Sequence, residues 1–184
     1  MDHYLDIQVE PDIELSAPAL LNNLFAKFHR TVAQTCKGQI AVSFPKQQKT
    51  LGNTLRLHGS YHHLSILMEQ PWLKGLRDYT QVGSISPVPE SILGYRTVSR
   101  VQKKSPQNMR KRSIKKGWLS AGEAIHRIPD TAQSLLALPY LQLRSLSNKN
   151  VMRIYIKLGE VSQTQTAGEF SSYGLSRTAT IPWF

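Results

Sequence analysis

His29 is the side chain of this sequence with the clearest capacity for acid–base chemistry. It lies in the stretch LLNNLFAKFHRTVAQ, residues 20–34, where apolar residues recur at helical spacing. At 100° per residue the leucines and phenylalanines form one face, and His29 lies at its edge, about 80° from the centre. An imidazole at such a boundary is partly accessible and can exchange a proton with a ligand. The periodicity leaves two hypotheses open, a working general base or an ordinary boundary histidine.

A second chemical feature is the run of cations between residues 91 and 122, where the sequence contains no acid. If residues 107–116 form a helix, positions 112, 115 and 116 project from the same side. Such a helix is too polar to be buried, so we expect it to bind an anion, most often nucleic acid. A solvated face is the alternative, although solvated faces usually contain acids too. The cations of this helix are Arg110, Lys111, Arg112, Lys115 and Lys116.

The segment HGSYHH, residues 58–63, offers a weaker signal. His58 and His62 have the i, i+4 spacing of a metal-binding pair on a helix, but no glutamate lies between them. Gly59 also interrupts a continuous helix. We therefore expect surface histidines at a strand-to-helix turn, and we predict no metal site.

The overall composition restricts the class of protein. The chain has 184 residues, of which 40% are hydrophobic, so it can bury a core, and its net charge of +11 favours polyanionic partners. The start, MDHYLDIQVEPD, has neither a positive segment nor an apolar run, and no stretch approaches the roughly 18 apolar residues of a membrane span. We expect a cytoplasmic protein without a membrane association. The single cysteine, Cys36, excludes an internal disulfide and a cysteine-based zinc site.

The elements that must position His29 follow a β-α-β-β-α-β order in residues 1–90, which predicts a ferredoxin-like domain. Strands are predicted at 4–9, 39–45, 54–60 and 78–84, and helices at 17–34 and 61–71. The prolines of ISPVPES, residues 85–91, predict a linker. We therefore predict two domains, 1–90 with the histidine and 91–184 with the basic helix.

The second domain is predicted to be β-rich. A strand at 95–102 precedes the basic helix of 105–117, which has Pro106 in its first turn and Gly117 at its end. Ser120 and Glu123 have the spacing of a capping box for a further helix over 120–128. The fold class is thus α+β. The remaining predicted strands are YLQLRS (140–145), VMRIYIKL (151–158), FSSYGLS (170–176) and TATIPWF (178–184).

As a whole, the sequence resembles the repeat-processing endoribonucleases of type I-F CRISPR systems, within the Cas6 superfamily. The segments that carry the resemblance are MDHYLDI (1–7), VSFP (42–45), VSRVQ (98–102), RIPDT (127–131), LRSLS (143–147), YGLS (173–176) and PWF (182–184). The resemblance implies a protein that binds the hairpin of a CRISPR repeat RNA and cuts the precursor once at the 3′ base of the stem. The implied nucleophile is the adjacent 2′-hydroxyl, which leaves a 2′,3′-cyclic phosphate and requires no cofactor.

The resemblance also implies roles for individual residues. His29 would be the general base, Ser145 would position the ribose, and Tyr173 would orient the imidazole or the RNA beside it. Ser147 would contact a nearby phosphate. The basic helix would lie in the major groove of the hairpin.

Two further RNA-binding residues are implied by VSRVQ, where Arg100 would contact guanine and Gln102 adenine through their base edges. The chain departs from the family pattern in its basic helix, where lysines replace arginines and lose bidentate recognition. It also has Met152 where an aromatic residue that stacks on the terminal base pair is expected.

The implied partners are the repeat RNA stem-loop and the other subunits of the type I-F surveillance complex, and we expect a monomer outside that complex. A non-catalytic RNA-hairpin-binding subunit is the main alternative, because it would need the basic helix and not His29. A basic DNA-binding protein is the weaker third hypothesis.

Overall fold

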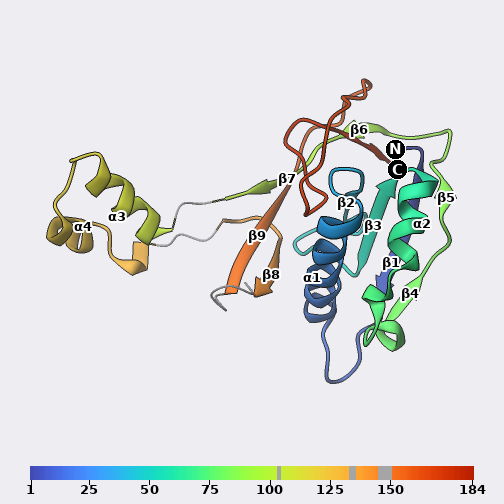
Figure 1. Cartoon of the computed structure of the whole chain (residues 1–184), viewed down its shortest axis with the longest axis horizontal. Coiled ribbons are helices and arrows are strands. Elements are labelled where there is room, and N and C mark those ends of the chain that lie inside the picture. Colours follow the sequence, from blue (N-terminus) through green and yellow to red (C-terminus); the bar gives the residue numbers. More distant parts are fainter. Residues whose placement is uncertain (103–104, 133–135, 145–150) are drawn as a thin grey trace. The chain divides into compact units, whose positions relative to one another are not determined.

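The structure is a computed structural model that describes residues 1–102, 105–132, 136–144 and 151–184 (Figure 1). Helices and antiparallel strands are mixed along the chain, which confirms the predicted α+β class. The described residues form two compact units, Met1–Arg100 with Leu138–Phe184, and Val101–Ala137. The division into domains at residue 90 stays a prediction. Among the helices of the described residues, none is long and apolar enough to cross a membrane.

The first unit is built around an antiparallel sheet with the strand order β2-β3-β1-β4. Its central strand β1 alternates buried and partly exposed residues, as predicted for a strand with one face on the core. The short strand β5 also pairs with β1, so part of the predicted linker is an edge of the sheet. The strands are β1 (His3–Val9), β2 (Ala41–Ser43), β3 (Thr54–Gly59), β4 (Thr80–Val82) and β5 (Ser86–Pro87).

Helix α1 (Ala17–Thr35) packs on this sheet through the apolar face that its sequence predicts. Helix α2 (Tyr61–Glu69) follows β3 and begins at Ser60, whose hydroxyl accepts the His63 N–H. Two single 3-10 turns, η1 (Pro71–Leu73) and η2 (Arg77–Tyr79), lead to β4. The buried residues of α1 are Leu20, Leu21, Leu24, Phe25, Phe28 and Val32.

A second sheet with the order β7-β9-β8 lies against another side of α1, as Figure 1 shows. Leu141, Leu143 and Ile154 of this sheet are buried in the same core as α1. Its strands are β7 (Val98–Val101), β8 (Tyr140–Arg144) and β9 (Val151–Leu158), and a separate pair is formed by β6 (Gly94–Arg96) and β10 (Ile181–Trp183). Helix α1 is therefore clamped between the two sheets, which restricts the movement of His29.

The C-terminus is anchored on the first sheet by Arg56 of β3. The Arg56 guanidinium donates two hydrogen bonds to the Asp6 carboxylate, at 2.7 and 2.8 Å, and a third of 3.0 Å to the main-chain oxygen of Phe184. It also lies over the rings of Tyr4 and Phe184, at 4.8 and 4.2 Å from their centroids. These contacts hold the last residue, Phe184, against strands β1 and β3 of the first sheet.

The segment FSSYGLS (170–176), predicted as a strand, forms a turn instead. The Gly174 N–H donates to the Ser171 carbonyl at 2.8 Å, and Gly174 has a φ of +68°, which favours glycine. The Gly174 carbonyl in turn accepts the Val42 N–H of β2 at 2.9 Å. The prediction failed because this long-range contact with β2, and not the local pattern of apolar residues, fixes the segment.

The second unit consists of α3 (Pro106–Lys115), α4 (Ala121–Arg127) and the 3-10 turn η3 (Asp130–Ala132). Both helix beginnings are confirmed, since the Ser105 hydroxyl accepts the Asn108 N–H and Ser120 forms a capping box with Glu123. The end of α3 at Gly117, with a φ of +69°, is also as predicted.

His58 is not the surface histidine that the sequence predicted. It is 1% exposed, because β3 is a central strand and directs this side chain inward. Its Nε2 shares a hydrogen bond of 2.8 Å with the Ser43 hydroxyl. Burial, and secondarily the positive charge of Arg56, lower the pKa of His58 to about 3, so the folded protein holds it neutral.

We therefore expect the free energy of unfolding to fall as the pH is lowered from 6.5 towards about 3. In this window the unfolded chain protonates His58 and the folded protein does not, which costs up to ~1.4 kcal/mol per pH unit. Urea unfolding of the wild type and of His58→Gln across this range measures the effect. His58→Gln should show the shallower pH dependence, and His62→Ala, at an exposed histidine, should follow the wild type. Equal slopes for the wild type and His58→Gln would contradict the assignment.

Candidate active site around His29

His29 is partly buried on α1 and stacks on the ring of Tyr173. The two ring centroids lie 4.0 Å apart, and the planes differ by 4°. Phe25, one helical turn earlier, lies nearly parallel to Tyr173, with centroids 6.3 Å apart and an angle of 12°. Tyr173 thus connects the imidazole to the apolar core, and the stack restricts rotation of the imidazole ring.

A hydrogen bond determines which nitrogen of His29 carries the proton. Nδ1 lies 3.0 Å from the Ser172 carbonyl oxygen. Because a carbonyl can only accept, Nδ1 must be the donor, and the neutral ring then keeps its lone pair on Nε2. The arrangement therefore presents Nε2 as the atom that can take a proton from a ligand.

The turn at residues 171–174 supplies both partners of His29. It is fixed internally, because the Ser171 hydroxyl donates to the Leu175 carbonyl at 3.0 Å, and it is fixed to β2 through Gly174 and Val42. A Cβ at position 174 would lie 2.9 Å from a Val42 side-chain carbon, so this position requires glycine. Ser172 was missed by sequence analysis, since a backbone carbonyl carries no signature in the residue type.

Arg100 of β7 lies beside the same aromatic ring. Its guanidinium carbon is 5.3 Å from the Tyr173 centroid. The Nε atom of Arg100 is buried and has no hydrogen-bond partner among the described residues. A buried donor of this kind is costly to leave unpaired, so an acceptor on a ligand would stabilise it. The structure brings together three of the predicted site residues, His29, Tyr173 and Arg100.

The predicted nucleic-acid-binding residues of the second unit lie mainly at its surface. Lys111, Arg112, Lys115 and Lys116 are exposed on or directly after α3, and Gln102 is exposed as well. Arg110 differs, because its guanidinium donates to the Ile128 carbonyl and to the Asp130 carboxylate at 2.7 Å. Arg110 thus joins α3 to the segment that follows α4.

The remaining predicted positions are Ser145, Ser147 and Met152. Ser145 and Ser147 lie outside the described residues, so their predicted roles stay predictions. Met152 lies on β9, opposite Leu143 of β8, and packs partly buried against the core. Within the described ranges, no group of three His, Cys, Asp or Glu residues could hold a metal ion.

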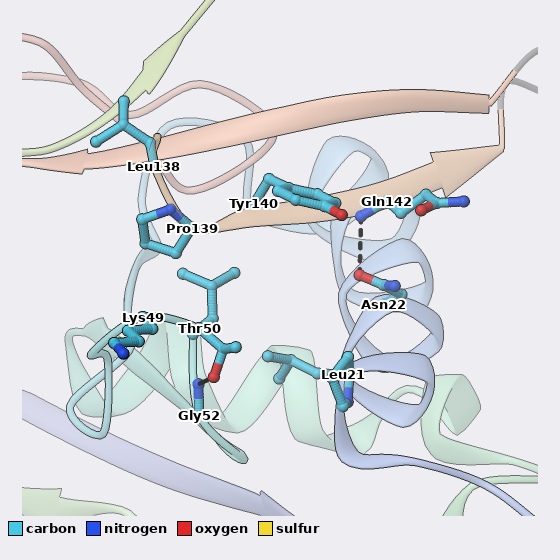
Figure 2. A pocket seen from close by; sticks show the side chains of 11 residues that line it. Leu21, Asn22, Lys49, Thr50, Gly52, Leu138, Pro139, Tyr140 and Gln142 are labelled. Atoms are coloured by element: carbon cyan, nitrogen blue, oxygen red, sulfur yellow. Dashed lines mark hydrogen bonds between the residues drawn. The ribbon is translucent and has the colours of Figure 1, made fainter. Parts of the chain in front are cut away.

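A pocket of about 220 Å³ lies at another place in the first unit, near the start of α1 and of β8 (Figure 2). None of the site residues predicted from the sequence lines it. Its edge contains a link between the two elements, because the Asn22 side-chain oxygen accepts the Gln142 N–H at 2.8 Å. The pocket therefore lies where α1 and β8 meet, beside the hydrogen bond that joins them.

Comparisons with known proteins cover the whole chain. Residues 4–184 match the family model described as CRISPR-associated protein (Cas_Csy4). The CRISPR-associated endonuclease Cas6/Csy4 of Escherichia coli (strain UTI89 / UPEC) is 49% identical over 185 residues. The CRISPR-associated endonuclease Cas6/Csy4 of Pseudomonas aeruginosa (strain UCBPP-PA14) is 43% identical over 188 residues. Both comparisons span 100% of this chain and 100% of the relative.

Proposed function

Because the chain belongs to the Cas_Csy4 family of CRISPR-associated proteins, we propose that it binds the hairpin of a CRISPR repeat RNA and cuts the precursor transcript once, at the 3′ base of the stem. The relatives are named endonucleases, which supports an endoribonuclease that processes CRISPR RNA. The observation that carries the proposed chemistry is the imidazole of His29, stacked on Tyr173 and bonded through Nδ1 to the Ser172 carbonyl.

In the proposed reaction, the 2′-hydroxyl next to the scissile phosphate is the nucleophile. His29 Nε2 removes its proton, the 2′ oxygen bonds to phosphorus, and the bond to the 5′ oxygen breaks. The products are a 2′,3′-cyclic phosphate and a 5′-hydroxyl, whose oxygen takes up a proton from solvent. The Ser172 carbonyl supports the base because its dipole stabilises the imidazolium that forms. The proposed reaction uses no metal ion or other cofactor.

The other proposed contacts orient the RNA. Ser145 would hold the ribose and Ser147 a phosphate, and these two roles rest on the family resemblance alone. Arg100 and Gln102 would bind a guanine and an adenine through their base edges. The buried, unpaired Nε of Arg100 is consistent with a donor that is satisfied only when RNA is bound.

The basic helix α3 is the proposed grip on the hairpin stem. Its exposed cations lie in a stretch that contains no acid. No carboxylate within this stretch neutralises their charge, so they can attract the phosphates of RNA. The protein would keep its product and remain with the guide RNA in a type I-F surveillance complex. We also propose that it is a monomer outside that complex and that it is cytoplasmic.

For residues 1–90 we propose a ferredoxin-like domain. The antiparallel order β2-β3-β1-β4 and the β-α-β-β-α-β sequence of elements support this assignment. The β-rich strands and the basic helix of residues 91–184 would then form the part that grips the RNA.

A non-catalytic hairpin-binding subunit is the second candidate. It would need α3 and Arg100, but it would have no use for an imidazole with a fixed tautomer. The contacts of His29 with Ser172 and Tyr173 therefore favour the enzyme. A DNA-binding protein is the weaker third candidate, because DNA has no 2′-hydroxyl that His29 could deprotonate.

Replacing His29 with alanine should slow cleavage of the repeat RNA by roughly 10²- to 10⁴-fold, the usual contribution of a general base. The affinity for the hairpin should stay within about twofold, because His29 contributes little to the electrostatic grip of α3. Single-turnover cleavage and a binding titration measure the two quantities separately. His62→Ala, which removes an exposed histidine of α2, should cut like the wild type. Undiminished cleavage by His29→Ala would overturn the assignment of the base.

Neutralising two exposed cations of α3, in Lys111→Gln/Lys115→Gln, should weaken hairpin binding and flatten its dependence on salt. If each lysine neutralises one phosphate, the slope of log K against log salt falls in magnitude by about 2. Titrations over a range of salt concentrations give this slope. The control is Lys37→Gln/Lys49→Gln, which removes the same charge from exposed positions outside α3. An unchanged slope in the α3 variant would show that this face is merely solvated.

A further inference from the structure

Trp118 is an exposed aromatic ring directly after the basic helix. Its side chain is 62% exposed, whereas Trp72 of the same chain is 6% exposed. Large aromatic side chains are usually buried for most of their surface, so an exposed tryptophan that is also rigidly held calls for an explanation.

The end of α3 holds the backbone of Trp118 rigidly. The Gly117 N–H donates to the Ile114 carbonyl and the Trp118 N–H donates to the Ser113 carbonyl, both at 3.0 Å. With Gly117 at a φ of +69°, these are the two hydrogen bonds of a Schellman cap. In such a cap the residue in the position of Trp118 usually packs on an apolar residue in the last turns of the helix. Here those positions hold Ser113 and Arg112, which offer the ring no apolar partner, and the ring stays exposed.

One cation lies over this ring, and others precede it closely in the sequence. The Lys116 ammonium lies 4.8 Å from the centroid of the Trp118 ring, and Lys115 and Arg112 belong to the last turn of α3. No acid occurs in the sequence from residue 91 to residue 122. A ligand that complements both the flat apolar ring and the cations must offer an aromatic face next to a negative charge. A nucleotide has both, in its base and its phosphate.

We propose that Trp118 stacks on an unpaired base of the RNA that α3 grips, while Lys116 moves to the adjacent phosphate. The base must be unpaired, because bases inside a duplex present only their edges to a protein. This inference rests on the proposed binding of an RNA hairpin and adds a contact outside the stem and the cleavage site. The unpaired base belongs either to the loop of the hairpin or to the single strand on its 5′ side.

The test uses the repeat hairpin of the protein's own CRISPR array, ending at the 3′ base of the stem so that nothing remains to be cut. Dissociation constants are measured at one salt concentration for the intact RNA, for an RNA with abasic loop nucleotides and for an RNA without its 5′ flank. Trp118→Ala should bind the intact RNA roughly 5- to 150-fold more weakly than the wild type, the range for loss of one base–aromatic stack. Trp118→Phe should lose less, because it retains a ring.

The modified RNAs locate the base. Wild type and Trp118→Ala should bind equally to whichever RNA lacks the stacked base, the abasic loop or the missing flank. The matched control is Ile125→Ala, which removes an exposed apolar side chain from the same unit and should bind every RNA like the wild type. Thermal unfolding of each variant shows that the fold is retained, and Trp118→Phe preserves the test if Trp118→Ala does not fold.

Three results would overturn the inference. Equal affinity of Trp118→Ala and the wild type for the intact RNA would assign the ring to another partner, such as a neighbouring protein. A loss that persists on both modified RNAs would exclude an unpaired base as the contact. If the wild type itself binds the hairpin no better than an unrelated hairpin, the proposed function fails together with this inference.

Discussion

The contact between His29 and the turn at residues 171–174 is the constraint on which the rest of the candidate site depends. Its two sides, His29 and Ser172, are 143 residues apart in the sequence. Helix α1 is clamped between two sheets, and the turn is bonded to β2 and continues into a C-terminus held by Arg56. Both partners are thus placed by rigid elements, and a hydrogen bond of 3.0 Å to a carbonyl is enough to fix the tautomer of the imidazole.

Charged residues have different roles in the two compact units. Those of the first unit maintain its structure, and those of α3 in the second unit are exposed and can bind a polyanion. The first unit contains the buried core and holds His58 neutral, and the partly buried Arg56 is matched by Asp6. The second unit contains the exposed cations of α3, whereas Arg110 is partly buried, pairs with Asp130 and joins α3 to the segment after α4. Charges that maintain the structure are paired, and charges on α3 remain available for phosphates.

Local sequence signals predicted the local structure well and the tertiary contacts poorly. The apolar face of α1, the capping box at Ser120 and the end of α3 at Gly117 depend on neighbouring residues, and all were predicted. The turn at 171–174 was mistaken for a strand, and His58 for a surface residue, because contacts with distant strands decide both. The family resemblance predicted that Tyr173 lies beside His29. The hydrogen bond from His29 to the Ser172 carbonyl could not be predicted, because a backbone carbonyl has no signature in the residue type.

The most direct test of the proposed chemistry is to determine the ends of the RNA fragments produced in the presence of EDTA. Repeat RNA is incubated with the wild-type protein, and the fragments are analysed by mass spectrometry. The account predicts a single cut at the 3′ base of the stem, with a 2′,3′-cyclic phosphate on the upstream fragment and a 5′-hydroxyl on the downstream one. Cleavage that EDTA abolishes, or fragments that end in a 3′-hydroxyl and a 5′-phosphate, would contradict it.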